Sequence, residues 1–77
     1  MPPKDNKCAA FGRAVRESRS AIGISQEALA DRARIHRTYI GGIERGERNP
    51  TLIMIFRLAE ALQVSADELI RLSEGGD

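Results

Sequence analysis

The sequence predicts an all-α domain of five short helices without strands, and three observations lead to this prediction. Apolar residues recur at the three- and four-residue spacing of amphipathic helices. Serine or threonine stands where three of these segments begin, as helix caps do. Glycine or proline stands where segments end, because these residues interrupt a helix. At 77 residues the chain has the length of one small domain.

The first helix is expected to begin at a cap, Asp5 or Asn6, and to run to about Ala21. Gly23 follows as its stop. The inward-facing residues have helical spacing: Phe11, Ala14, Val15 and Ile22.

Two short helices separated by a tight turn are expected next. Ser25 caps the first of them, which extends to about residue 33. Residues 34–36 make the turn, and the second helix takes residues 37–45 up to a stop at Gly46. The inner faces hold Leu29, Ala30 and Ala33 in the first helix and Ile40 and Ile43 in the second.

Two further helices complete the predicted fold. Pro50 blocks continuation of the preceding helix, and Thr51 caps the fourth, which runs to about Leu62. Ser65 and Glu68 form the capping-box pattern at the start of the fifth. The expected inner stripe of the fourth helix consists of Leu52, Ile55, Leu58, Ala59 and Leu62.

The segments outside these helices set the expected domain boundaries. Pro2 and Pro3 oppose helix, so a flexible arm is expected over residues 1–7. The domain follows over residues 8–73, and residues 74–77 read as a tail.

Charge is distributed unevenly along the chain. The segment from Glu60 to Asp77 holds five acidic residues and one basic residue, a net charge of −4. The rest holds eleven basic and six acidic residues, a net charge of +5. A basic body with an acidic end is expected to approach a polyanion with the body, although chance asymmetry is common in small domains.

Metal, redox and membrane roles find little support. The single cysteine, Cys8, excludes a disulfide or a cysteine-based metal site within one chain. The only histidine, His36, has no metal-ligand partners in the sequence, and Cys8 has no evident base, so no enzyme activity, metal or cofactor is expected. No apolar run is long enough to span a membrane, which makes a cytoplasmic location the default expectation.

Several sequence motifs of this chain resemble those of the helix-turn-helix regulators that include lambda repressor and Cro-like (XRE) proteins. The resemblance covers about residues 11–72. It rests on Ile24-Ser25-Gln26-Glu27, Leu29-Ala30, Ile40, Ile43-Glu44-Arg45-Gly46, Arg48-Asn49-Pro50-Thr51-Leu52 and Leu58-Ala59-Glu60-Ala61-Leu62. The stretch from His36 to Ile40, joined to that from Ile43 to Pro50, is most similar to the controller proteins of restriction-modification systems. The resemblance implies a five-helix, lambda-repressor-like fold and a homodimeric transcriptional regulator that binds a pseudo-palindromic site in double-stranded DNA.

The resemblance and the helix geometry together indicate which residues contact DNA. The second helix of the motif enters the major groove, where an arginine can bond a guanine through O6 and N7. The expected DNA-binding residues are Gln26, Arg37, Thr38, Tyr39, Gly42, Arg45, Arg48 and Asn49. For Tyr39, a half-buried packing role is an equal alternative. Gly41 and Gly42 each lower the stability of the helix, so their presence needs a reason. One explanation is close approach of the backbone to DNA at Gly42, and the other is tight packing on the first helix.

Three further residues are interpreted structurally from the same resemblance. Arg19 and Glu44 match an ion pair that joins the first and third helices in related repressors. Arg34 stands where those proteins commonly have a turn glycine, so it must accept strain or alter the turn.

Protein partners are expected on two surfaces. Ile53, Met54, Phe56 and Ile70 add apolar surface to the last two helices, which form the dimer contact in controller proteins. Glu27 and Asp31 match acids that touch the RNA polymerase sigma subunit in activating repressors, although a solvated acidic face is the simpler interpretation. A chain this short leaves no room for a separate effector domain, so no small-molecule effector is expected.

Several functions fit the same residues. A controller protein that autoregulates its operon is preferred over a phage-type repressor or the antitoxin of a toxin–antitoxin pair. A protein-interaction adaptor without DNA binding belongs to another class, and the presence of Gln26, Arg37 and Arg48 argues against it.

Overall fold

The computed structural model describes residues 6–75, with the side chains of residues 7–75, and these form five helices. In chain order they are α1 (Asn6–Ala21), α2 (Gln26–Ala33), α3 (Arg37–Glu44), α4 (Leu52–Leu62) and α5 (Ala66–Ser73). The all-α prediction and the approximate bounds of every helix are confirmed.

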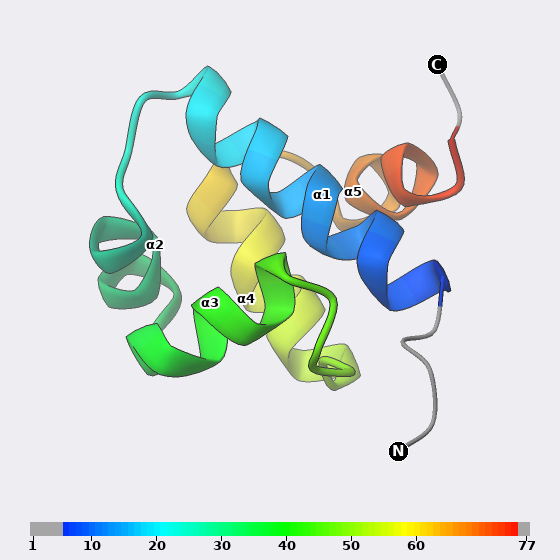
Figure 1. Cartoon of the computed structure of the whole chain (residues 1–77). Coiled ribbons are helices and arrows are strands. Elements are labelled where there is room, and N and C mark those ends of the chain that lie inside the picture. Colours follow the sequence, from blue (N-terminus) through cyan, green and yellow to red (C-terminus); the bar gives the residue numbers. More distant parts are fainter. Residues whose placement is uncertain (1–5, 76–77) are drawn as a thin grey trace.

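Helix α1 is the element around which the others pack. It contacts α3, α4 and α5, while α2 packs against α3 and α4. Figure 1 shows α1 crossing the molecule, with α2 and α3 together on one side and α5 on the other. The α2–α3 unit is therefore carried as a block on a scaffold made by α1 and α4.

The core is formed by the residues that helical spacing turns inward. Seven side chains are almost completely buried: Leu29, Ile40, Ile43, Leu58, Leu62, Leu69 and Val15. Phe11, Ala14, Ala30 and Ala33 join the same buried cluster, as predicted. Burial of this apolar surface is the main favourable term in the stability of the fold.

Three predicted placements are wrong. Ile22 follows the last residue of α1 and is 36% exposed. Leu52 continues the inner stripe of α4 but is 66% exposed. Helical spacing predicts the direction in which a side chain points, but it does not predict where the neighbouring helices end. Asn6 and Lys7 belong to α1 and not to the predicted arm, whose residues 1–5 lie outside the described part of the chain. Pro3 restricts its neighbours in the chain but not a residue three positions later.

Side-chain caps begin α2, α4 and α5 as the sequence predicts. The hydroxyls of Ser25, Thr51 and Ser65 each accept a hydrogen bond from a backbone N–H three residues on, at 3.0, 3.2 and 3.1 Å. Helix α3 has an unforeseen cap, because His36 Nδ1 accepts from the N–H of Thr38 at 3.2 Å. Each cap satisfies a backbone donor at a helix start that has no partner within the helix.

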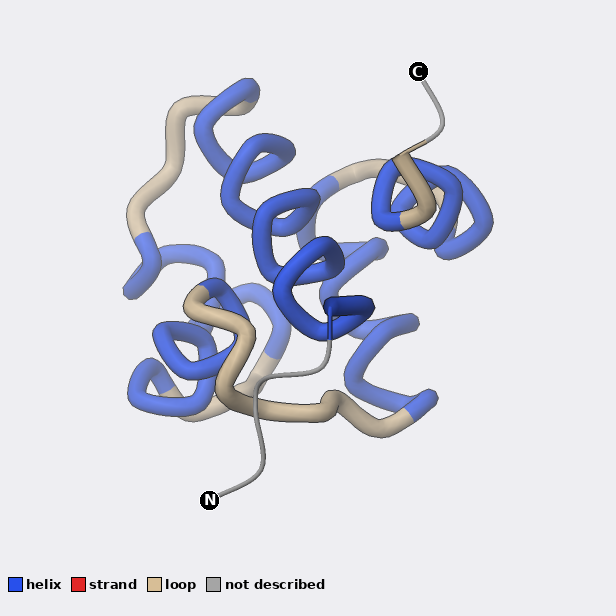
Figure 2. The backbone as a smooth tube through the Cα atoms, turned by 45° about the vertical axis from the view of Figure 1, so that its right-hand side comes forward, coloured by secondary structure: helices blue, strands red, loops and turns tan. Residues whose placement is uncertain are grey.

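The connections between helices set the direction of α3. Arg34 ends α2 in the left-handed conformation, with φ 58° and ψ 43°. The chain therefore makes the turn that glycine would make, and the motif is intact. Figure 2 shows the longer loop that follows α3 as an extended segment along the lower edge of the molecule, leading to α4.

Within residues 6–75, none of the helices has both the length and the apolar character needed to cross a bilayer.

Candidate nucleic-acid interface

The first residues of α2 and α3 meet at one surface. Gln26 begins α2 and Arg37 begins α3. The Arg37 Nη1 donates a hydrogen bond to Gln26 Oε1 at 3.3 Å. Two residues predicted to contact DNA, eleven positions apart in the chain, are thus brought into direct contact.

A buried carboxylate holds this pair in place. Glu44, the last residue of α3, is 8% exposed, and its Oε1 accepts a hydrogen bond from Gln26 Nε2 at 3.0 Å. The Gln26 side-chain NH₂ group therefore donates toward the buried Glu44, while its oxygen accepts from the exposed Arg37. This orientation aims its oxygen at the Arg37 guanidinium.

The predicted ion pair between Arg19 and Glu44 is present. Arg19 Nε lies 2.7 Å from Glu44 Oε2, and Arg19 Nη2 lies 3.0 Å from Oε1, so the two planar groups meet through two bonds. The hydrogen bond to Glu44 raises the pKa of Arg19, partly opposed by desolvation and helped by the charge of Glu44. Arg19 Nη1 also donates to the carbonyl of Ile24 at 2.9 Å. One arginine of α1 therefore fixes both the end of α3 and the loop before α2.

Two residues of α1 near this pair were not foreseen. Arg16 Nε lies 4.0 Å from Glu44 Oε1, although its side chain is 67% exposed. Gly12 is buried, and a Cβ there would collide with the carbonyl oxygen of Ile43. A glycine inside a helix was the available signal, because it lowers helix stability unless something packs closely against it.

The outward side of α3 presents Arg37 and Thr38, which are both exposed. Tyr39 is half-buried and packs against the core, as one of its two interpretations predicts. The Arg48 guanidinium carbon lies 5.1 Å from the centre of the Tyr39 ring, a cation–π contact. An arginine from the loop after α3 is therefore brought back onto α3.

Gly42 does not lie open on the outward face as predicted. It is buried, and a Cβ at Gly42 would lie 2.7 Å from Arg48 Cγ. Gly41 is also buried, and its Cβ would lie 3.0 Å from Arg45 Nη1. Neither packing on α1 nor an exposed backbone accounts for the two glycines, because arginine side chains cover them.

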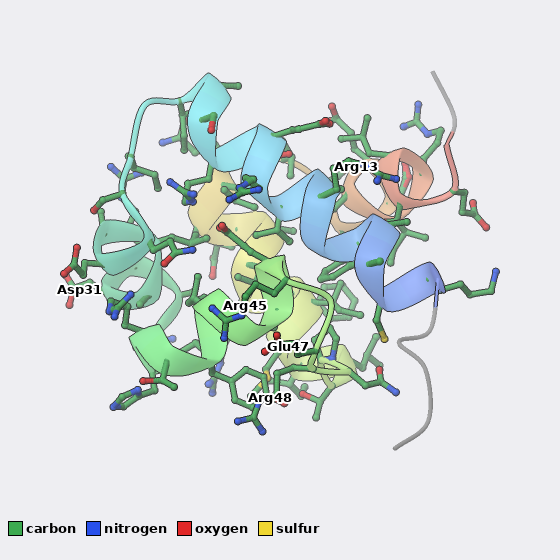
Figure 3. All side chains as sticks on the ribbon, viewed as in Figure 1. Arg13, Asp31, Arg45, Glu47 and Arg48 are labelled. Carbon is green, nitrogen blue, oxygen red and sulfur yellow. The ribbon has the colours of Figure 1, made fainter. Side chains whose placement is uncertain are left out.

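The loop after α3 carries the remaining predicted contacts. Arg45 and Arg48 lie beside α3 in Figure 3, with Glu47 near them. Arg45 Nε pairs with Glu47 Oε1 at 3.1 Å. Asn49 is exposed and lines a groove beside Cys8. Basic and polar side chains thus extend from the start of α3 into this loop.

The surfaces expected to bind proteins lie on other helices. Glu27 and Asp31 are exposed on α2, and Figure 3 shows Asp31 on its outer side. Phe56 and Ile53 on α4 are 55% and 60% exposed, and Ile70 on α5 is 39% exposed. Met54, assigned to the same interface, is half-buried against the core.

Among residues 6–75 there is no cluster of three or more histidine, cysteine, aspartate or glutamate side chains placed to hold a metal ion. His36 serves as the cap of α3. The exposed guanidinium of Arg37, held by Gln26, suits the phosphates and base edges of a duplex.

Comparisons with known proteins agree with this arrangement. The family model described as helix-turn-helix matches residues 13–69. The control protein C.SmaI of Serratia marcescens is 48% identical over 56 residues, which are 73% of this chain and 67% of that protein. The control protein C.BamHI of Bacillus amyloliquefaciens is 43% identical over 68 residues, 87% of this chain and 84% of that protein. The crystal structure of the restriction-modification controller protein C.AhdI from Aeromonas hydrophila superposes with a TM-score of 0.79 at 47% identity, covering 80% of this chain and 94% of that one.

Proposed function

This chain belongs to the helix-turn-helix family of DNA-binding transcriptional regulators, and from that premise we propose that it is the controller protein of a restriction-modification system. In this proposal it acts as a homodimer, binds a pseudo-palindromic operator and regulates its own operon. The similarity to control proteins from two organisms and to a solved controller structure supports the assignment.

The observation that carries the proposal is the chain of contacts from Glu44 through Gln26 to Arg37. It holds an exposed guanidinium at the first turn of α3, the part of a recognition helix that reaches base edges. We propose that Arg37 reads a guanine through its O6 and N7 atoms, a contact worth about 1–3 kcal/mol of discrimination. Thr38 lies beside it and contacts a thymine methyl group or a phosphate.

The remaining contacts go to the DNA backbone. We assign Gln26 at the start of α2, and Arg45, Arg48 and Asn49 after α3, to phosphates of the operator. Such contacts fix the register of the protein on the duplex and make binding depend on salt. Arg48 stands close enough to Tyr39 to place its charge at the edge of the groove.

The dimer forms through α4 and α5 in this proposal. The exposed apolar side chains Leu52, Phe56 and Ile70 border one hollow between these helices. A two-fold contact there buries apolar surface that the monomer leaves in water. It also presents two copies of α3 to major grooves about 34 Å apart, one turn of the duplex.

The regulatory behaviour follows from the number of dimers bound. We propose that one dimer at low concentration activates the operon and that a second dimer, bound at higher concentration, represses it. The protein's own concentration is then the signal.

A mobility-shift titration against the DNA upstream of this protein's gene tests the proposal. The experiment is run at two salt concentrations, with Arg37→Ala as the comparison. We expect two successive complexes, weakened by salt and reduced at least about tenfold in affinity by Arg37→Ala, since one bidentate contact is lost. A single complex insensitive to Arg37 would contradict the proposal, and binding only with a partner protein present would favour an antitoxin.

A further inference from the structure

The outer face of α3 has a depression where two glycines follow one another. Gly41 and Gly42 lie in the second half of α3, and both are buried although they belong to a helix at the molecular surface. The atoms nearest to a Cβ added at either glycine belong to arginine side chains that begin further along the chain. A pair of glycines is unfavourable inside a helix, so their presence calls for a local reason.

The Arg48 side chain lies flat in this depression. A Cβ added to Gly42 would lie 2.7 Å from Arg48 Cγ, 3.2 Å from Arg48 Nε and 3.5 Å from Arg48 Cδ. The aliphatic part of the side chain therefore passes directly over Gly42. Its guanidinium group ends 5.1 Å from the centre of the Tyr39 ring, three residues earlier on α3 and hence on the same face.

Gly41 differs from Gly42 in what covers it. The nearest atom to a Cβ at Gly41 is Arg45 Nη1 at 3.0 Å, and the next is Arg45 Cζ at 3.8 Å. These atoms are the far end of a flexible side chain, which can move aside at little cost. At Gly42 the obstructing atom is Arg48 Cγ, close to the backbone, which cannot move unless the whole side chain leaves its place.

We propose that Gly42 is a positioning residue for Arg48: the missing side chain at Gly42 forms a seat that holds Arg48 along α3 and against Tyr39. Arg48 belongs to the loop after α3, and the seat places its positive charge beside the middle of the recognition helix. This inference rests on the proposed function, because it gives the seated arginine a role at the operator. Gly42 itself then touches no DNA, and its effect on binding is exerted entirely through Arg48.

The seat matters for affinity because it orders Arg48 before DNA arrives. A free arginine side chain loses considerable rotational freedom when it is fixed in one contact. In the seat, part of that loss has already occurred during folding, and stacking on Tyr39 fixes the plane of the guanidinium group. Binding should therefore weaken when the seat is filled, even though Arg48 keeps its charge.

The first experiment examines the free protein. In ¹⁵N-labelled protein, the Nε–Hε signal of Arg48 is assigned by its loss in Arg48→Ala. We expect ring currents from Tyr39, the single tyrosine in a chain without tryptophan, to displace this signal. The displacement should disappear in Gly42→Ala and in Tyr39→Leu and persist in Gly41→Ala. An unmoved Arg48 signal in Gly42→Ala overturns the proposal, and this result does not depend on whether the protein binds DNA.

The second experiment measures operator affinity in a double-mutant cycle. We expect Gly42→Ala to weaken binding about tenfold, the scale of one charged contact, and Gly41→Ala to weaken it less than about twofold. In the Arg48→Ala background, Gly42→Ala should have no further effect, because the residue it positions is absent. A full loss from Gly42→Ala in that background would instead mean that the backbone at Gly42 approaches DNA directly, which overturns the inference.

The two experiments separate this inference from the proposed function. If wild-type protein binds no operator while the Arg48 signal responds to Gly42→Ala, the seat exists and the proposed function fails. If the operator is bound and lost with Arg37→Ala but Gly42→Ala leaves the Arg48 signal unmoved, the function stands and the seat fails. Circular dichroism shows that each variant is folded; alanine favours helix at both positions.

Discussion

At the scale of single residues, Glu44 connects stability to the recognition surface. It is the one buried charged residue in the described part of the chain, and it accepts bonds from Arg19 on α1 and Gln26 on α2. A buried charge is tolerated only when partners replace the water it has lost. Because those partners come from two other helices, the same carboxylate both joins α1 to α3 and orients Gln26.

Glu44→Ala should lower the free energy of unfolding by about 3 kcal/mol, because it leaves the Arg19 guanidinium partly buried without its partner. Urea denaturation at fixed protein concentration measures the change. Arg16→Ala is the matched control: its side chain is 67% exposed and 4.0 Å from the same carboxylate, so a change within about 0.5 kcal/mol is expected. Equal effects of the two substitutions would contradict the assignment of Glu44 as the central partner.

At the scale of helices, the ends are set by a mixture of favourable and unfavourable residues. Serine and threonine caps begin α2, α4 and α5. Two helices end on residues that seldom adopt the left-handed conformation, Arg34 at φ 58° and Gln63 at φ 64°. A side chain with a Cβ is strained in that region. Both residues keep the left-handed conformation because the packing of the helices on either side determines the path of the chain.

Arg34→Gly should therefore raise the free energy of unfolding by about 0.5 kcal/mol. Relief of the backbone strain stabilises the folded state, and the greater conformational freedom of glycine in the unfolded chain offsets part of this gain. Gly23→Ala is the opposite test. Its φ is +71° with no atom within 4 Å of a Cβ, so about 1 kcal/mol should be lost from backbone strain alone. Thermal unfolding of both variants checks the signs, and a destabilising Arg34→Gly would show that the arginine side chain contributes more than its backbone costs.

At the scale of the whole molecule, the arginines proposed to contact DNA and the exposed apolar side chains lie on different helices. Arginines are exposed on α3 and the loop after it, while exposed apolar side chains gather on α4 and α5. Helix α4 buries one face against α1 and α2 and leaves Phe56 at 55% and Leu52 at 66% exposure. The proposed dimer contact and the proposed operator contact therefore use different helices.

Phe56→Glu should weaken the proposed dimer by about 2 kcal/mol or more, because a charge would enter the centre of an apolar contact. Sedimentation velocity over a range of protein concentrations measures the dissociation constant. Ile22→Glu, at a residue 36% exposed beyond the end of α1, is the control and should leave the dimer intact. If Phe56→Glu remains as dimeric as wild type, the contact lies on another face.

Sequence reasoning alone predicted the helices, the caps of α2, α4 and α5, most of the core and the motif. These depend on spacing and on residues close in the chain, and period and capping chemistry report such relations directly. The assignment of Arg19 and Glu44 to an ion pair also came from sequence, through resemblance to related repressors. The residues proposed to contact DNA remain predictions, to be tested by the operator titrations.

Contacts between residues distant in the chain became apparent only in the folded molecule. Leu52 follows the pattern of a core residue, yet no helix covers it. Gly42 follows the pattern of an outward position, yet Arg48 folds back and covers it. Gly12 is required because α3 approaches α1 closely, and the link from Glu44 through Gln26 to Arg37 joins residues from different parts of the chain. Periodicity gives the direction of a side chain, but the position of each neighbouring helix, and the path of a long arginine across it, depends on the packing of the entire chain.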